Sequence, residues 1–110
     1  GISLSRAILP EAVVQLGVVP VANYATPGTQ EVPDSIAPYC RSHNGVLLAN
    51  HGAVCVGKDA NAAFKVCNVL EMTAHIYYMA RSIGEPEPIS REDVEYMKDF
   101  AANRYGQDKN

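Results

Sequence analysis

Two short apolar runs separated by one polar turn constrain the fold of this 110-residue chain most strongly. The first run extends from Val46 to Ala49 and the second from Ala53 to Val56, with Asn50-His51-Gly52 between them. Runs of this length, rich in Val and Leu and bounded by glycines, are typical of buried strands. We therefore predict two paired strands with a bend at Asn50-His51-Gly52.

His51 is the residue of this bend that suggests a chemical role. A histidine at the junction of two strands is held on a fixed backbone, and Gly52 allows a sharp turn or the close approach of another group. This placement suits a metal ligand, because imidazole binds zinc through one nitrogen and needs a fixed orientation. A hydrogen-bonded core histidine is the commoner explanation for such a residue, and the residues alone leave both interpretations open.

Local signals divide the rest of the chain into short elements. Residues 1–8 have no clear period and are expected to form a connector, whereas prolines, glycines and capping residues mark the helices. The predicted elements are a helix from Pro10 to Leu16 that ends at Gly17, a strand from Val18 to Ala22, a helix from Asp34 or Ser35 to about Ser42, and a last helix opened by Ser90 that extends to about Tyr105.

The loop from Tyr24 to Thr29 contains Pro27-Gly28, which predicts a turn. This loop is either a rigid connection or one wall of a substrate cleft, since loops on rigid scaffolds often carry function. The residues do not decide between the two.

The segment Ala60–Ile83 is the longest predicted element, and Asp59 is its expected N-cap. Steps of three and four residues place one set of apolar or small side chains on one face: Ala63, Val66, Leu70, Thr73, Tyr77 and Ala80. A second set widens that face: Phe64, Val69, Met72, Ile76 and Met79. A helix that is apolar around so much of its circumference is either buried on two sides or lies at a subunit interface. We therefore expect self-association.

Composition excludes several classes of partner. A net charge of −3 provides no basic face for nucleic acid. No apolar stretch reaches the length of about 18 residues that a membrane span needs. Cys40, Cys55 and Cys67 are odd in number and form no Cys-x-x-Cys pair, so neither a disulfide framework nor a zinc–thiolate site is indicated. Reduced, partly buried thiols in a cytoplasmic protein are the expected state.

Three further polar residues have simple structural explanations. We interpret Glu11 as a first-turn glutamate favoured by the helix dipole. His43 is interpreted as a solvated loop residue at the end of a helix, and His75 as a hydrogen-bonded histidine within the long helix.

Several of these segments together resemble the class II aldolase/adducin family. The resemblance rests on the run Leu47–Val54, the turn Gly57-Lys58-Asp59 and a long helix that carries Leu70-Glu71. Upstream, Pro20–Thr29 is similar to another loop of that family, at a matching distance from the histidine. The likeness covers about residues 7 to 84, in the right order. It implies an α/β fold with three layers, in which a mostly antiparallel sheet is flanked by helices, and this fold is incomplete in the chain.

The resemblance also implies a metal-dependent function. In catalytic members of the family a zinc ion is held by three histidines, and the third lies where His51 lies. Asn50 and Gly52 would then support the orientation of that ligand. The parent protein would cleave a ketose phosphate by a retro-aldol reaction through a metal-stabilised enediolate. L-fuculose-phosphate aldolase is the nearest activity, although epimerases and a dehydratase share the scaffold. The family usually forms symmetric four-fold assemblies, so a homotetramer is expected.

Other features of the family are missing from the sequence. Its first two zinc ligands form a His-x-His pair just before the point where this chain begins, and its acid/base glutamate lies further upstream. Residues 1–110 are therefore expected to be the C-terminal part of a longer domain, to contain no catalytic residue and to be inactive alone. Two alternatives remain: a non-catalytic interaction module like the adducin head domain, or a stable fragment without a function of its own.

Overall fold

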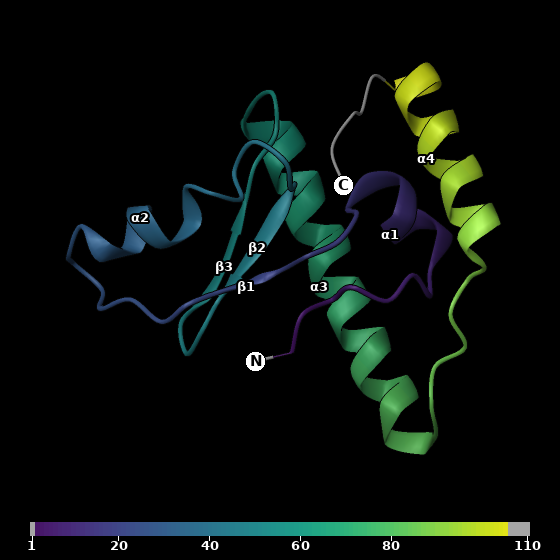
Figure 1. Cartoon of the computed structure of the whole chain (residues 1–110), viewed down its shortest axis with the longest axis horizontal. Helices are drawn as coiled ribbons and strands as arrows, with labels where there is room; N and C mark the ends of the chain where they lie inside the picture. The colour runs from purple at the N-terminus through teal and green to yellow at the C-terminus, as the bar shows by residue number, and fades with distance from the viewer. Residues whose placement is uncertain (1, 106–110) are drawn as a thin grey trace.

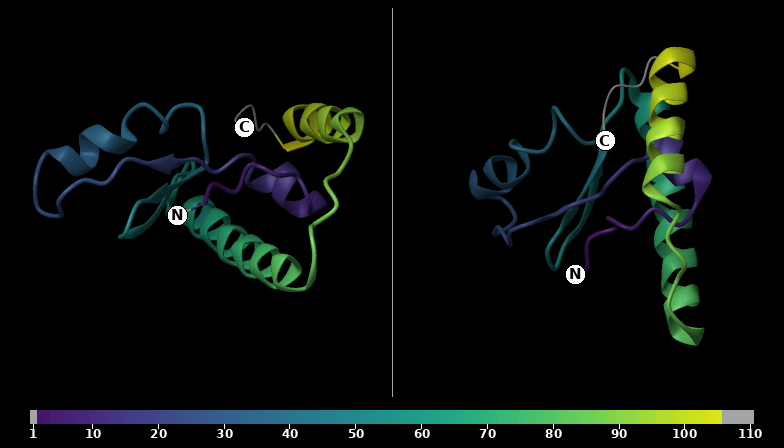
Figure 2. Two further views of the ribbon diagram at one scale, coloured as in Figure 1. Left: turned by 60° about the horizontal axis from the view of Figure 1, so that its bottom comes forward. Right: turned by 45° about the vertical axis from the view of Figure 1, so that its right-hand side comes forward.

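The computed structural model describes residues 2–105, with Arg104 and Tyr105 described by their backbone alone. A small sheet lies in the middle, with α1, α3 and α4 on one side of it and α2 at the opposite end of the molecule (Figures 1 and 2). The elements in chain order are α1 (Pro10–Gln15), β1 (Val21–Ala22), α2 (Glu31–Ile36), β2 (Gly45–Leu48), β3 (Gly52–Cys55), α3 (Ala60–Ile83) and α4 (Arg91–Tyr105).

The sheet is mixed, with the strand order β1-β2-β3. β2 and β3 form an antiparallel hairpin in which Val46 is paired with Val54 and Leu48 with Gly52. β1 pairs with β2 in parallel, with Val21 opposite Leu47. The longer pairing is thus antiparallel and the shorter one is parallel. The predicted three-layer arrangement with a mostly antiparallel sheet stays a prediction.

The strand predicted from Val18 to Ala22 is shorter than expected, because Pro20 has no N–H to donate to a neighbouring strand. Only Val21 and Ala22 join the sheet, although the carbonyl of Pro20 still accepts a hydrogen bond from Leu47 N at 2.9 Å. Val19 pairs instead with Leu4 through two backbone hydrogen bonds of 3.0 and 3.1 Å. The single predicted strand is therefore divided between two partners.

The N-terminal segment is irregular, as expected for a connector, but it is also docked onto the rest of the chain. Besides the bridge at Leu4, the carbonyl of Ala7 accepts a 2.6 Å hydrogen bond from Ile89 N in the connection between α3 and α4. Arg6 forms an ion pair with Glu85 in the same connection. We refer to these two contacts as the N-terminal clasp. Its members are far apart in the sequence, which is why no local pattern predicted it.

The predicted bounds of α2 were also wrong. The helix begins at Glu31, not at Asp34 or Ser35, and it ends at Ile36, not near Ser42. Pro33 lies in its first turn, where a helix needs no N–H donor. Ala37 N still donates to Pro33 O at 3.0 Å, but Pro38 cannot donate the next bond, so the chain continues as turns.

The core lies where α1 and α3 meet the sheet. Its buried side chains are Ala12 and Leu16 of α1, Val19, and Leu70 of α3, and Leu16 and Val19 are almost completely buried. α1 ends at Gln15, close to the predicted Leu16, and Gly17 follows with a φ of 76°. α1 packs against both α3 and α4 and so connects the two longer helices.

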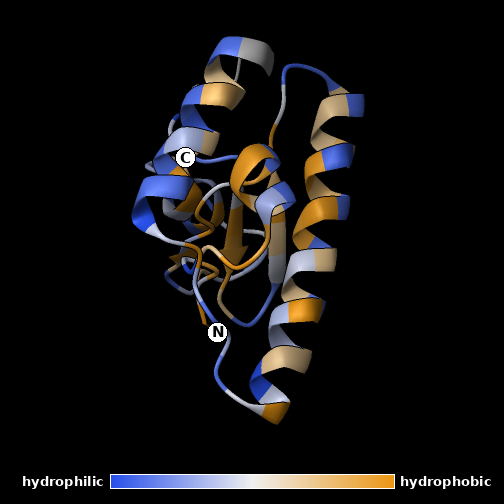
Figure 3. Cartoon of the chain, turned by 90° about the vertical axis from the view of Figure 1, so that its right-hand side faces the viewer, coloured by the Kyte–Doolittle hydropathy of each residue, from blue (hydrophilic) through white to orange (hydrophobic). Residues whose placement is uncertain are grey.

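The predicted bounds and cap of α3 are confirmed. Asp59 Oδ1 accepts a hydrogen bond from Ala62 N at 2.8 Å, and Leu70 and Thr73 are buried on the face that the periodicity predicted. The residues that widen the apolar face are mostly on the outside, because Phe64, Met72 and Met79 are exposed. Figure 3 shows hydrophobic positions along the whole length of α3. Ser90 caps α4 as predicted, with its Oγ accepting from Asp93 N at 3.2 Å.

Within residues 2–105, no helix combines the length and the apolar character that crossing a membrane requires.

Candidate functional site

The predicted bend between β2 and β3 is confirmed, and it is a tight turn around Ala49, Asn50 and His51. His51 N donates to Leu48 O at 3.1 Å, and Asn50 has a φ of 61°. A left-handed residue at the third position of a turn is typical of a type II turn, and asparagine adopts that conformation more readily than most residues. Asn50, not Gly52, therefore makes the turn sharp, which corrects the expectation for Gly52.

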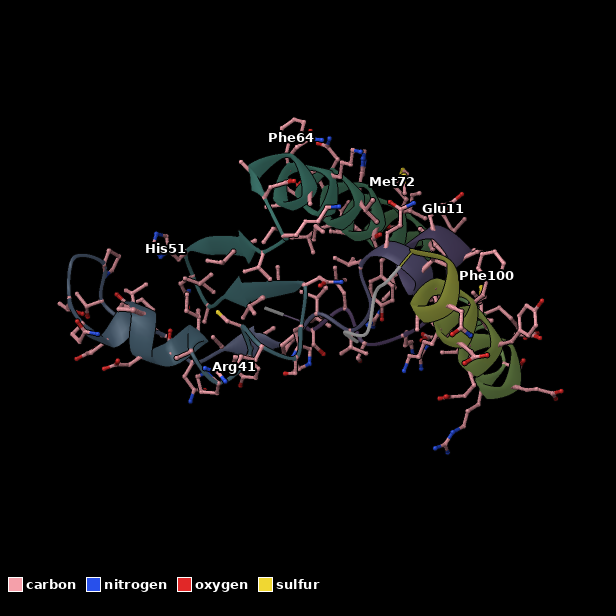
Figure 4. The ribbon with its side chains drawn as sticks, turned by 90° about the horizontal axis from the view of Figure 1, so that it is seen from above. Glu11, Arg41, His51, Phe64, Met72 and Phe100 are labelled. Atoms are coloured by element: carbon pink, nitrogen blue, oxygen red, sulfur yellow. The ribbon has the colours of Figure 1, made fainter. Side chains whose placement is uncertain are left out.

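His51 is exposed at the tip of this hairpin (Figure 4). The explanation of a buried, hydrogen-bonded core histidine is therefore wrong. A side chain at Gly52 would also meet nothing within 4 Å, so the next residue along the chain faces open space too. No hydrogen bond joins the side chains of Asn50 and His51 in the described part of the chain. Asn50 acts on His51 through the backbone of the turn.

A second loop begins at the same edge of the sheet. Because β1 and β2 are parallel, their C-terminal ends lie side by side. The loop after Ala22 and the turn after Leu48 therefore start together, and Ala49 N donates to Ala22 O at 3.4 Å. This edge brings together two of the segments that carry the family resemblance, Pro20–Thr29 and Leu47–Val54. The sequence alone did not predict the proximity, since two residues of β1 give no signal of parallel pairing.

The loop from Tyr24 to Thr29 contains the predicted turn. Thr29 N and Thr29 Oγ1 both donate to Thr26 O, at 3.3 and 2.7 Å, and Gly28 has a φ of 83°. Pro27 and Gly28 thus occupy the two central positions that suit a type II turn. Ala25 is buried and fixes the loop, whereas Tyr24 is exposed near the start of it. Hydrogen bonds within the loop hold its turn in place, and the loop exposes one aromatic side chain to solvent.

The other two histidines have different surroundings. His43 is half-buried, not solvated as predicted: its Nδ1 lies 2.8 Å from Ser42 Oγ, and its ring meets that of Tyr39 edge-on at 5.8 Å. His75 is exposed on α3. Glu11 is an exposed residue of the first turn of α1, as predicted.

His51 is a candidate ligand of a metal centre. A catalytic zinc site needs three protein ligands with a fourth position open. Among residues 2–105, no three side chains of His, Cys, Asp or Glu are grouped so that they could hold a metal ion. His51 is suited to be a single ligand, because its imidazole is exposed on a hydrogen-bonded turn. The described residues do not complete a zinc site.

A family comparison agrees with this arrangement. The family described as Class II Aldolase and Adducin N-terminal domain matches residues 2–78. The chain belongs to this family. The matched region contains the whole sheet, the hairpin with His51, the loop after β1 and most of α3.

Individual relatives are enzymes that act on phosphorylated sugars or sugar acids, according to their names. The 5-deoxy-D-ribulose 1-phosphate aldolase of Bacillus thuringiensis is 37% identical over 87 residues, which are 78% of this chain and 40% of that protein. The 3-oxo-tetronate 4-phosphate decarboxylase of Pectobacterium atrosepticum is 36% identical over 74 residues, which are 67% of this chain and 34% of that protein.

A solved structure of L-fuculose 1-phosphate aldolase matches the fold with a TM-score of 0.79 and 32% sequence identity. The match covers 93% of this chain and 46% of that one. The chain therefore spans less than half the length of these relatives.

Proposed function

We propose that this chain is part of a zinc-dependent aldolase or related lyase that cleaves a ketose phosphate, and that His51 is one of the metal ligands. The observation that carries the proposal is the placement of His51 on a rigid, exposed turn, at the edge where both family-like segments meet. The named relatives support a phosphorylated sugar as the class of substrate. The remaining ligands would come from outside the described residues.

Different residues at this edge of the sheet would orient the metal ligand His51 and contact the substrate. The left-handed backbone of Asn50 fixes the direction in which His51 leaves the hairpin. Gly52 has no side chain to fill the open space next to its own backbone. The hydrogen-bonded loop at Tyr24 would form one wall of a substrate cleft, since it starts at the same edge of the sheet as the turn that carries His51.

A bound zinc ion would supply Lewis-acid polarisation of the substrate carbonyl next to the bond that breaks. His51 would have to be neutral to bind the ion, and it would contribute one nitrogen ligand. One histidine cannot hold a catalytic zinc ion, so we expect the isolated 110-residue chain to be inactive.

The test replaces His51 in the longer protein of which this chain is proposed to be a part. His51→Ala should remove both bound zinc and cleavage of a ketose phosphate, whereas His75→Ala, on the exposed surface of α3, should leave both intact. Zinc content is measured by elemental analysis, and cleavage by release of the aldehyde product. Stoichiometric zinc in the His51→Ala protein would refute the role of His51. Absence of zinc and activity from the unsubstituted protein would favour the adducin-like, non-catalytic alternative.

We also propose that the chain self-associates through the exposed apolar face of α3, and that the whole protein is a homotetramer. Phe64 is 64% exposed and Ile83 is 92% exposed, and Met72 and Met79 lie between them along the helix. Contiguous exposed apolar surface of this kind marks interfaces. Sedimentation at micromolar concentration should show more than a monomer, and Phe64→Ser should weaken association while Glu95→Ser, at an exposed position of α4, should not. A soluble monomer of the unsubstituted chain would contradict the assignment.

A further inference from the structure

The corner between β3 and α3 is packed tightly through small residues. A Cβ atom placed on Gly57 would lie 2.6 Å from Ala63 N and 2.8 Å from Ala62 Cβ, so the first turn of α3 lies directly against the end of the strand segment. The close contact leaves room for glycine alone. It also fixes which residues on either side of the corner face each other.

Cys55 and Cys67 lie further from the corner, along the contact between β3 and α3. We call this contact the seam. Side chains two residues apart in extended chain point to the same face, so Cys55 shares the face of Gly57. Side chains four residues apart in a helix share a face, so Cys67 follows Ala63. The two steps have similar lengths, about 6.6 Å in a strand and about 6 Å in a helix. Both lead away from the corner, since β3 and α3 are consecutive and in contact.

The surroundings of the two thiols agree with this juxtaposition. Cys55 is half-buried and packs against the core, and so does Val66, the residue before Cys67. Burial raises the pKa of the Cys55 thiol to about 11, and the charge of Cys67 and a hydrogen bond to Cys67 add to the shift. Cys67 is exposed on α3. One thiol of the pair is thus accessible and the other is protected and protonated at neutral pH.

We propose that Cys55 and Cys67 are a reversible oxidation site, in which a peroxide converts the two free thiols into a disulfide between β3 and α3. The exposed Cys67 sulfur attacks hydrogen peroxide, the O–O bond breaks, and a sulfenic acid and one water form. The Cys55 sulfur then attacks the Cys67 sulfur, an S–S bond forms, and a second water leaves with the Cys55 proton. In total, two thiols lose two hydrogens and two electrons, and one peroxide is reduced to two waters.

This site is independent of the proposed metal ligand. Cys55 is at the far end of the β2–β3 hairpin from His51, because it pairs with Gly45 while the turn follows Leu48. The disulfide would connect the strand to the helix across a corner where the two elements are already in contact. A thiol reductant would reverse the reaction by exchange.

The experiment treats the purified chain with a small excess of hydrogen peroxide and maps its disulfides by digestion with trypsin without reduction. Lysines at 58 and 65 and arginines at 41 and 81 place Cys55 in the peptide 42–58 and Cys67 in the peptide 66–81. We expect these two peptides to be joined, with a mass lower by two hydrogens than their sum. A reductant should separate them. Recovery of both peptides unlinked, with Cys67 oxidised to sulfinic acid, would overturn the proposal.

Two matched variants identify the order of events. In Cys55→Ser, Cys67 has no resolving thiol, so its sulfenic acid should accumulate and be trapped by a dimedone probe. In Cys40→Ser, the joined peptides should form as in the unsubstituted chain, because Cys40 is located after α2 and is not part of the seam. Loss of the link in Cys40→Ser, or a link of Cys67 to Cys67 of a second copy in the unsubstituted chain, would refute the assignment of the pair.

Discussion

Replacement of Gly57 by alanine tests whether the β3–α3 corner is as tight as the structure indicates. The added Cβ would lie 2.6 Å from Ala63 N, 2.8 Å from Ala62 C and 2.8 Å from Ala62 Cβ. Unbonded heavy atoms prefer separations of about 3.5–4.0 Å, so the corner would have to open by roughly 1 Å. Two of the three atoms belong to the helix backbone, which cannot move aside as the end of a flexible side chain can.

The expected cost is in the upper part of the range for overpacking, about 2–3 kcal/mol of unfolding free energy. Gly52→Ala is the matched control, because a Cβ there would meet nothing within 4 Å and the residue does not have a positive φ. Its free energy of unfolding should change by less than about 0.5 kcal/mol, or rise slightly as the unfolded chain loses freedom.

Urea unfolding followed by far-ultraviolet circular dichroism measures both variants. With a urea dependence of about 1–2 kcal/mol/M for a chain of this size, Gly57→Ala should lower the midpoint by about 1–3 M. The slope should stay unchanged, since the surface exposed on unfolding is the same. Equal midpoints for Gly57→Ala and Gly52→Ala would show that α3 does not pack against the end of β3 as described.

Three further changes have defined outcomes. Asp59→Ala removes the cap of α3 and should lower the unfolding free energy by about 1 kcal/mol in urea titration; an unchanged midpoint would contradict the cap. Leu70→Ala should cost about 2–5 kcal/mol because a buried side chain is lost, whereas Phe64→Ala, at a site 64% exposed, should change the stability of the monomer by less than about 0.5 kcal/mol. Burial raises the pKa of Cys55 from its ordinary 9.0 to about 11, so its contribution to stability is complete below pH 9.0 and is lost between there and about pH 11. Because the thiol is partly exposed, the loss is on the order of 1 kcal/mol after allowance for solvent screening, and Cys55→Ala should lack this part of the pH dependence of the urea midpoint.

The features that the sequence predicted well have strong local signals. Asp59 at the start and Gly84 after the end delimit α3, and its steps of three and four residues identified the buried face at Leu70. The β2–β3 hairpin was evident from two Val-rich runs around a polar bend. Such elements are determined by residues close in the sequence, so a single sequence is enough to predict them.

The features that the sequence missed depend on distant contacts or on backbone conformation. The parallel pairing of β1 with β2 places the Tyr24 loop beside the hairpin turn. No periodicity in the sequence predicts this pairing. The sharp turn was expected at Gly52, because glycine adopts a positive φ more readily than other residues. The residue with the positive φ is Asn50. For the candidate site, the sequence placed His51 at the bend and left two interpretations open, of which the buried core histidine is wrong because the side chain is exposed. The metal, the tetramer and the position of the chain as a C-terminal part stay predictions.

The N-terminal clasp has a consequence for the order in which the chain folds. The β2–β3 hairpin and its contact with α3 involve neighbouring segments and close only short loops. The bond from Ile89 to Ala7 closes a loop of most of the chain, and its entropic cost is higher before other contacts form. The hairpin and α3 therefore fold as an early unit, and the clasp closes last. In native-state hydrogen exchange, the Ile89 amide should open at lower free energy than the Leu47 amide in the sheet.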